Sequence, residues 1–266
     1  MTFSSQTLRL VSSLAAALLL SGCAAFAPPE RVAAGGFTLA AWTRFASGPG
    51  AETLTVYIES DGAPWARRDA PPADPTPRDS LALRLARADS APAVAWLARP
   101  CQYLEPGELA ACDSRYWRRA RYAPEVIDAT SAALDRLLER SGAHRIVLVG
   151  YSGGGAVAAL VAARRSDVEL LVTVGGVLDT RAWTTWHAIT PLDASLNPAD
   201  TPTLAGLRQV HFVGTEDEVT PPALAEAFAA RMGPPARVVR VPGHDHACCW
   251  VGDWPRLITE LRENSS

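Results

Sequence analysis

The chain has 266 residues, 48% of them hydrophobic, and its 25 basic residues, all of them arginine, stand against 28 acidic residues. Because it has no lysine, the chain lacks the primary amine required for Schiff-base chemistry, for a Walker-type phosphate site or for a Ser-Lys dyad. The formal net charge of -3 argues against nucleic-acid binding, which requires an excess of positive charge to neutralise phosphates.

The first 22 residues are predicted to be a secretory signal. Arg9 precedes an apolar run at residues 10–20, which is too short for the roughly 20 residues that span a bilayer. The run ends in Leu20-Ser21-Gly22-Cys23, which resembles the bacterial lipoprotein box, in which the cysteine is acylated and becomes the mature N-terminus. The resemblance implies a lipid anchor on Cys23 at the bacterial cell envelope, on the periplasmic face of the outer membrane; the alternative is an ordinary cleaved signal. Residues 23–34 are small and proline-bearing, as expected of a tether.

Apolar runs alternate with helical patterns from Phe37 onward. Strands are predicted at 37–45, 54–58, 94–98, 145–149, 170–174, 209–213 and 237–241, and helices at 79–88, 126–140, 156–165, 222–232 and 255–262. Apolar strands that alternate with helices are typical of a mostly parallel sheet covered by helices on both faces. The sequence therefore predicts one α/β domain at residues 35–266, with a short cap-like insertion around 180–207.

Export would place the other four cysteines in an oxidising compartment, where disulfides persist. Cys101 and Cys112 flank a short loop, and we expect them to pair. Cys248 and Cys249 are neighbours, so a bond between them is strained, and one of them could instead reach Cys101 or Cys112. A zinc site is the competing use, but the segment lacks the second spaced pair of structural zinc sites.

A candidate nucleophile lies between the strand at 145–149 and the helix at 156–165. The segment Gly150-Tyr151-Ser152-Gly153-Gly154 fits the pattern G-x-S-x-G. A chain that leaves a strand and enters a helix so abruptly forces the serine into a strained conformation, and flanking glycines remove the clashes that would forbid the turn. We therefore interpret Ser152 as a nucleophile, against the alternative of a structural glycine-rich turn.

Without lysine, the base that activates a serine near neutral pH is expected to be a histidine. His144 and His211 lie at the starts of predicted strands, which places them at the opposite edge of the sheet, and His187 lies in the insertion, where it could touch substrate. His244 and His246 follow the last predicted strand, at the same edge as the serine. We favour His246, whose loop is long enough to fold back over the serine, and keep His244 as the alternative.

An acidic residue is needed to orient the histidine and to stabilise its protonated form. Asp217 follows the strand at 209–213 and is the favoured residue, ahead of its neighbours Glu216 and Glu218. Asp179, which follows the strand at 170–174, remains an alternative because a carboxylate there could also reach the histidine loop.

The strand-turn-helix around Ser152, the Gly214 to Asp217 strand end and the loop from Gly243 to His246 resemble an α/β-hydrolase. Segments 57–62, 99–103 and 195–198 are similar to segments of small, uncharacterised bacterial α/β-hydrolase lipoproteins. The resemblance implies an α/β-hydrolase fold and an oxyanion hole built from the amide of Gly153 and an amide of the Asp61-Gly62-Ala63 loop. Many family members have His-Gly in that loop, so Asp61 is a departure, and either Gly62 or Ala63 is expected to be the donor.

The expected activity is acyl transfer through an acyl-enzyme, with a small-molecule ester as substrate and no cofactor or metal. Tyr151 and two tryptophans of the insertion, Trp183 and Trp186, are expected to line the substrate pocket, unless the tryptophans only pack the insertion down. We expect a monomer whose membrane contact is the lipid on Cys23, without nucleic-acid partners. A peptidase or acyltransferase with the same triad and a non-catalytic envelope binding lipoprotein remain as alternatives.

Overall fold

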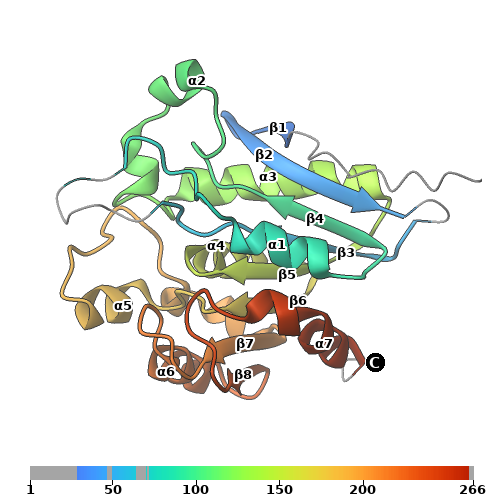
Figure 1. The fold of residues 1–266 in the computed structure, drawn as a ribbon, viewed down its shortest axis with the longest axis vertical. Helices are drawn as coiled ribbons and strands as arrows, with labels where there is room; N and C mark the ends of the chain where they lie inside the picture. The colour runs from blue at the N-terminus through green and yellow to red at the C-terminus, as the bar shows by residue number, and fades with distance from the viewer. Residues whose placement is uncertain (1–28, 47–49, 64–69, 71, 264–266) are drawn as a thin grey trace, which may run out of the picture.

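The computed structural model of the chain describes residues 29–46, 50–63, 70 and 72–263 (Figure 1). The predicted signal at residues 1–22, the predicted lipidation site Cys23 and the first part of the predicted tether lie outside these residues. Among the residues that are described, no helix is both long enough and apolar enough to cross a bilayer.

An eight-stranded sheet forms the centre of the molecule, in the order β1-β2-β4-β3-β5-β6-β7-β8. The six strands from β4 to β8 in this order run parallel, whereas β2 runs antiparallel to both of its neighbours. The strands are β1 (Glu30–Ala34), β2 (Phe37–Phe45), β3 (Thr53–Ile58), β4 (Ala93–Leu97), β5 (Arg145–Tyr151), β6 (Val168–Val174), β7 (Gln209–Gly214) and β8 (Ala236–Val241).

Helices cover both faces of the sheet, which confirms the predicted α/β class (Figure 1). One core lies between the sheet and α3, α4 and α6, and a second core lies between the opposite face and α1 and α7. The helices are α1 (Leu81–Ala88), α2 (Pro106–Ala110), α3 (Pro124–Ser141), α4 (Gly153–Ala162), α5 (Thr180–Trp186), α6 (Pro222–Met232) and α7 (Trp250–Glu263), and 3-10 turns occur at Ser114–Trp117, Pro198–Asp200 and Pro202–Gly206.

The alternation of side chains along β5 explains why its residues 146–149 are all apolar. Ile146 and Leu148 belong to the core under α3 and α4, whereas Val147 and Val149 belong to the core under α1 and α7. Successive side chains of a strand point to opposite faces, so a strand covered on both faces needs an apolar residue at every position.

Two local expectations were wrong. The tether was expected to extend to residue 34, but Glu30–Ala34 forms the edge strand β1, paired antiparallel with β2. The last helix was expected to begin at Pro255, but it begins at Trp250 and has the proline inside it. Trp250 and Trp254 are fully buried one helical turn apart, so packing of this face outweighs the helix-breaking tendency of Pro255.

The predicted cap-like insertion holds one short helix, α5, and two 3-10 turns. Asn197 joins the later part of the insertion to its start. Its Oδ1 accepts a hydrogen bond of 2.9 Å from the Thr180 amide, and its Nδ2 donates to Asp179 Oδ1 at 3.1 Å. The amide of Leu196 donates to the carbonyl of Tyr122 at 3.0 Å, which joins the insertion to the segment before α3.

Candidate active site

Ser152 lies between β5 and α4, and its backbone has a conformation that residues other than glycine rarely adopt, with φ 53° and ψ -123°. The amide of Ser152 donates to the carbonyl of Val174 at 3.0 Å, which fixes the turn against β6. The turn is tight enough that a Cβ on Gly150 would come within 2.4 Å of the Gly154 carbonyl oxygen. The two glycines therefore allow the abrupt strand-to-helix passage that was predicted for this segment.

Ser152, His246 and Asp217 form a continuous series of side-chain contacts. His246 Nε2 lies 3.0 Å from Ser152 Oγ, and His246 Nδ1 lies 2.8 Å from Asp217 Oδ2. An ionised carboxylate can only accept, so Nδ1 carries the proton and Nε2 is free to accept the serine proton. The three residues follow β5, β7 and β8, whose carboxyl ends meet at one edge of the parallel sheet (Figure 1).

The Asp217 carboxylate is fully buried, and both of its oxygens accept hydrogen bonds. Oδ1 accepts from the amides of Val219 at 2.9 Å and Thr220 at 2.7 Å, and Oδ2 accepts from Thr220 Oγ1 at 2.8 Å in addition to His246. Burial by itself raises the pKa of Asp217, but the hydrogen bond and charge of His246 and the Thr220 donors outweigh it, so the pKa is lowered. Asp217 therefore stays ionised at neutral pH. Nothing in the sequence pattern indicated the part played by Thr220.

The loop that carries His246 is held in place on both sides. Tyr151, predicted as a substrate-pocket residue, donates from its hydroxyl to the His246 carbonyl at 3.1 Å, and the two rings lie 5.2 Å apart between centroids. Trp250 Nε1 donates to the carbonyl of Asp245 at 2.9 Å. The Asp245 carboxylate in turn accepts from the amide of Ala247 at 2.8 Å. These contacts limit the positions that the imidazole can take.

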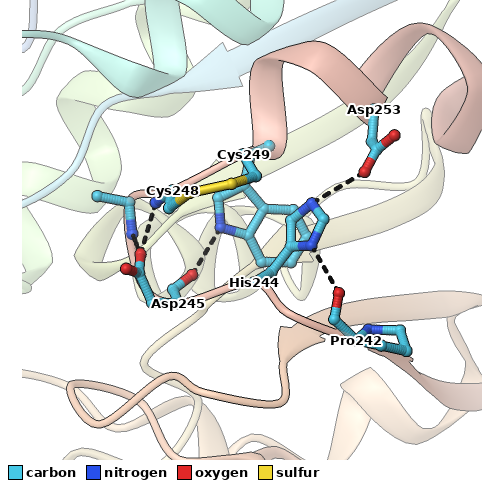
Figure 2. The surroundings of a disulfide bond; sticks show 8 residues. Pro242, His244, Asp245, Cys248, Cys249 and Asp253 are labelled. Atoms are coloured by element: carbon cyan, nitrogen blue, oxygen red, sulfur yellow. Dashed lines mark hydrogen bonds and ion pairs between the residues drawn. A yellow bond between two sulfur atoms is a disulfide. The ribbon is translucent and has the colours of Figure 1, made fainter.

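His244, the second histidine of this loop, has Pro242 and Asp253 as its polar partners (Figure 2). Its Nδ1 lies 3.1 Å from the Pro242 carbonyl oxygen, its Nε2 lies 3.2 Å from Asp253 Oδ2, and its ring packs edge-on against Trp250. A buried histidine held in this way supports the loop.

Asp179 and His187 are also engaged away from the serine. Asp179 caps α5 by accepting from the amides of Arg181 and Ala182, and its second oxygen pairs with Arg231 at 3.1 Å. His187 Nε2 lies 2.8 Å from the Val219 carbonyl oxygen. Of the remaining candidate acids and bases, Glu216, Glu218 and His144 are exposed. His211 is buried inside β7.

Two of the backbone amides expected in the oxyanion hole have acceptors already. The amide of Ala63 donates to the Pro75 carbonyl at 2.9 Å, and the amide of Gly62 donates to Ser60 Oγ at 3.3 Å. Gly153 begins α4, and an amide at that position has no acceptor within its own helix. The structure therefore does not support Gly62 or Ala63 as the second donor of the oxyanion hole, whereas the amide of Gly153 remains available.

The amide of Asp61 is the one in this loop that remains without a hydrogen-bond acceptor among the residues that the structure describes. Glu59 N donates to the Leu97 carbonyl at 3.0 Å and Ser60 N to the Glu59 carboxylate at 2.7 Å, whereas Asp61 N has no acceptor in the described part of the chain. Asp61 also lies against the serine turn, because a Cβ on Gly153 would come within 2.1 Å of Asp61 Oδ1. Within residues 59–63, Asp61 is thus the residue whose amide has no acceptor in the described part of the chain, and its carboxylate lies beside Gly153.

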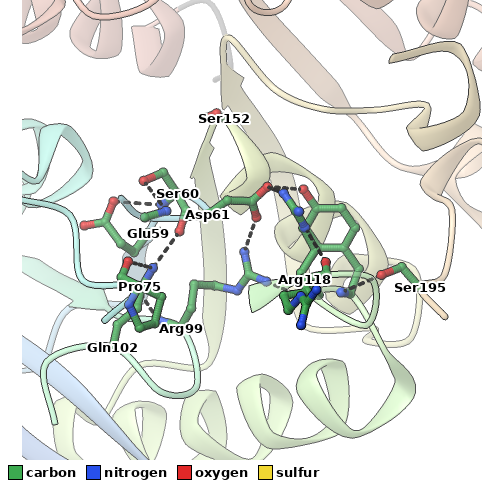
Figure 3. Close-up of polar contacts among 12 residues, drawn as sticks. Glu59, Ser60, Asp61, Pro75, Arg99, Gln102, Arg118, Ser152 and Ser195 are labelled. Carbon is green, nitrogen blue, oxygen red and sulfur yellow. Dashed lines mark hydrogen bonds and ion pairs between the residues drawn. The ribbon is translucent and has the colours of Figure 1, made fainter. Parts of the chain in front are cut away.

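The Asp61 carboxylate is surrounded by cationic and hydroxyl donors (Figure 3). Arg99 Nη1 donates to Oδ1 at 3.2 Å, and Oδ2 accepts from Arg121 Nη1 at 2.9 Å and from the Tyr122 hydroxyl at 2.7 Å. Burial raises the pKa of Asp61, but the charges of Arg121 and Arg99 outweigh it and the pKa is lowered. Sequence reasoning missed these three partners, because the segment that contains Arg99 stands out only through a family resemblance.

Both pairs of cysteines are disulfides. The expected bond between Cys101 and Cys112 is present, at a sequence separation of 11. Cys248 and Cys249 bond to each other, so neither of them reaches the first pair (Figure 2). The adjacent pair links the end of the His246 loop to the start of α7.

The two tryptophans of α5 differ in their surroundings. Trp183 is half-buried, and its Nε1 donates at 2.8 Å to the carbonyl of Val219, in the loop that carries Asp217. Trp186 is 58% exposed and Val219 is 41% exposed. Trp183 therefore joins the insertion to the loop at residues 215–221 that contains Asp217, which we call the acid loop. Trp186 and Val219 add exposed apolar surface to these two segments. Within the described residues, no three His, Cys, Asp or Glu side chains are grouped so as to hold a metal ion.

No protein-family model and no curated protein matches the chain. Among solved structures, Est1E from Butyrivibrio proteoclasticus is similar, with a TM-score of 0.64 at 13% identity over 90% of this chain and 98% of that one. An alpha-beta serine hydrolase homologue from Coxiella burnetii has a TM-score of 0.58 at 14% identity, over 90% and 97% of the two chains. The esterase domain of a Rhodothermus marinus protein has a TM-score of 0.56 at 16% identity, over 88% and 94%. At these identities the likeness is one of fold.

Proposed function

Because the chain has the α/β-hydrolase fold, we propose that it is a serine hydrolase that cleaves a small-molecule carboxylic ester, with Ser152 as nucleophile, His246 as base and Asp217 as the orienting acid. The observation that carries the proposal is the series of contacts from Asp217 through His246 to Ser152. The esterase and serine hydrolase named among the similar structures support the reaction class.

Acylation follows from the geometry. His246 Nε2 takes the proton of Ser152 as Oγ forms a bond to the ester carbonyl carbon, and the carbonyl π electrons move onto oxygen. The amides of Gly153 and Asp61 donate to this oxyanion. When the carbonyl re-forms, the bond to the alcohol oxygen breaks, and the protonated His246 gives its proton to the leaving alcohol.

Deacylation repeats these steps with water. His246 takes a proton from water, the hydroxide oxygen attacks the acyl carbon, and Ser152 leaves with the proton that returns from His246. Asp217 stays ionised throughout and stabilises the imidazolium that forms twice in the cycle. No step needs a group from outside the chain except water.

Hydrolysis of p-nitrophenyl esters tests the reaction class. The wild-type protein is expected to release p-nitrophenol in a reaction that Ser152→Ala abolishes, and p-nitroanilide analogues are expected to react much more slowly. Hydrolysis of the anilides at the same rate as the esters would favour a peptidase, and inertness toward both would favour a binding lipoprotein.

We further propose that Trp183 and Trp186 of α5 contact the substrate. The apolar surface that Trp186 shares with Val219 beside the acid loop supports this role. In a series of esters of rising acyl length, Trp186→Ala is expected to raise KM for the longer esters and to leave the acetate ester unchanged. An equal effect on every ester, or none, would place Trp186 outside the substrate path.

The anchor is a separate proposal that rests on the sequence of the first 23 residues. We propose that lipidation of Cys23 holds the monomeric domain at the cell envelope, on the periplasmic face of the outer membrane. Expression in a bacterium and fractionation of the membranes tests it: the wild-type chain is expected in the membrane fraction and Cys23→Ala in the soluble fraction. Recovery of both in the same fraction would contradict lipid anchoring.

A further inference from the structure

Asp61 stands where a negative charge is unexpected. A Cβ on Gly153 would come within 2.1 Å of its Oδ1, so the carboxylate lies directly beside the residue that follows the nucleophile (Figure 3). A bare carboxylate here would repel the negative charge that develops on the carbonyl oxygen during ester cleavage. The surroundings of Asp61 must therefore cancel its charge if the site is to work.

Two arginines more than cancel that charge. Arg99 and Arg121 each donate to Asp61, at 3.2 Å and 2.9 Å, so the group carries one positive charge in excess. The Arg99 side chain is 4% exposed and the Arg121 side chain 13% exposed, which limits screening by water. The Nε of Arg99 is buried and has no hydrogen-bond partner. The excess positive charge has no anionic partner among these residues in the free protein.

The arginines are themselves held rigidly. Arg121 Nε donates to the carbonyl of Arg118 at 2.7 Å, and Arg99 Nη2 donates to the carbonyl of Arg121. Tyr122 gives Asp61 its third donor, and the amide of Tyr122 donates a hydrogen bond to Ser195 Oγ at 3.0 Å. The carboxylate is thus tied to the end of β4, to the segment before α3 and to the insertion at once.

We propose that Asp61 acts twice in ester cleavage: its backbone amide is the second oxyanion donor, and its carboxylate, clamped by Arg99 and Arg121, is a positioning group that holds this amide beside Gly153. The inference rests on the proposed esterase function. The Asp61 clamp, defined as Asp61, Arg99, Arg121 and Tyr122, stands in place of the His-Gly pair that many α/β-hydrolases have in this loop.

A purely structural role for the clamp makes a different prediction. If the clamp only ties loops together, its loss lowers stability or weakens all binding alike. If it serves the oxyanion, its loss lowers kcat with little change in KM, and it weakens binding of a boronic acid, whose adduct with the serine imitates the tetrahedral intermediate.

The experiment compares Asp61→Asn with wild type and with Arg119→Gln, a control in the same segment whose exposed side chain pairs with Asp193. Asp61→Asn is expected to lower kcat at least about tenfold at unchanged KM and to raise the inhibition constant of an alkyl boronic acid by a similar factor. Arg119→Gln is expected to match wild type in all three values.

Tyr122→Phe covers the case in which Asp61→Asn does not fold, because it removes one donor without changing a charge. It is expected to change kcat and boronate affinity in the same direction by a smaller factor. Unchanged kcat in a folded Asp61→Asn or Tyr122→Phe variant, or loss in KM alone, would overturn the clamp while wild-type hydrolysis still supports the esterase. Absence of hydrolysis by the wild type would overturn the esterase, and the clamp's role with it.

Discussion

The Nε2 atom of His246 lies 3.0 Å from the Oγ atom of Ser152, although 94 positions separate the two residues in the sequence. His244, two positions before His246, instead contacts Pro242 and Asp253. One histidine of this loop is therefore in place to take the serine proton, and the other supports the loop.

Replacement of the two histidines separates these roles. His246→Ala is expected to slow ester hydrolysis by about three orders of magnitude or more, since a serine without its base is a poor nucleophile. His244→Ala is expected to keep most of the activity and to lower the melting temperature instead. Steady-state kinetics and thermal unfolding of both variants provide the check, and loss of activity in His244→Ala alone would reverse the assignment.

Gly154 is expected to tolerate no side chain. A Cβ there would lie 2.3 Å from the Ile58 carbonyl oxygen and 2.5 Å from that of Glu59, and both are backbone atoms that cannot turn aside. Gly154→Ala is therefore expected to lower the free energy of unfolding by about 1–3 kcal/mol. Gly252→Ala in α7 meets no atom within 4 Å and is expected to raise it by about 0.5–1 kcal/mol. Urea unfolding of the pair measures both changes, and equal effects would contradict the argument.

His211 makes stability depend on pH. Burial inside β7 lowers its pKa from 6.5 to about 3. Below pH 6.5 the unfolded chain takes up a proton that the folded chain cannot, so the free energy of unfolding falls as the pH falls, by about 2 kcal/mol at pH 5. His211→Phe is expected to remove this part of the pH dependence, whereas His144→Gln, at an exposed site, is expected to retain it. Identical pH profiles for wild type and His211→Phe would contradict the lowered pKa, because His211 would then take up its proton equally in the folded and the unfolded chain.

The two disulfides are expected to differ in their effect on stability. In the chain-entropy description, the Cys101–Cys112 bond, with a sequence separation of 11, stabilises by about 3 kcal/mol, and the Cys248–Cys249 bond, with a separation of 1, by about 1 kcal/mol. Chemical unfolding of the double serine variant of each pair measures these values. A larger loss from the adjacent pair would mean that it stabilises the His246 loop in some way other than by restricting the unfolded chain.

The residues around Ser152 differ in how far the sequence could predict them. Ser152, Asp217 and His246 each follow a strand of the predicted parallel sheet, so their common edge of the sheet could be predicted from the topology. The free amide of Asp61 could not, because it depends on which other amides of the loop are taken by Pro75 and Ser60. Likewise β1 is a short strand of small and polar residues, and only its pairing with β2 reveals it.

The central claim, that Ser152 is a nucleophile activated by His246, is tested most directly by labelling with a fluorophosphonate probe and by mass spectrometry of the labelled peptide. The wild-type protein is expected to carry the label on Ser152, and Ser152→Ala is expected to remain unlabelled. Labelling of Ser152→Ala at the wild-type rate would contradict the assignment.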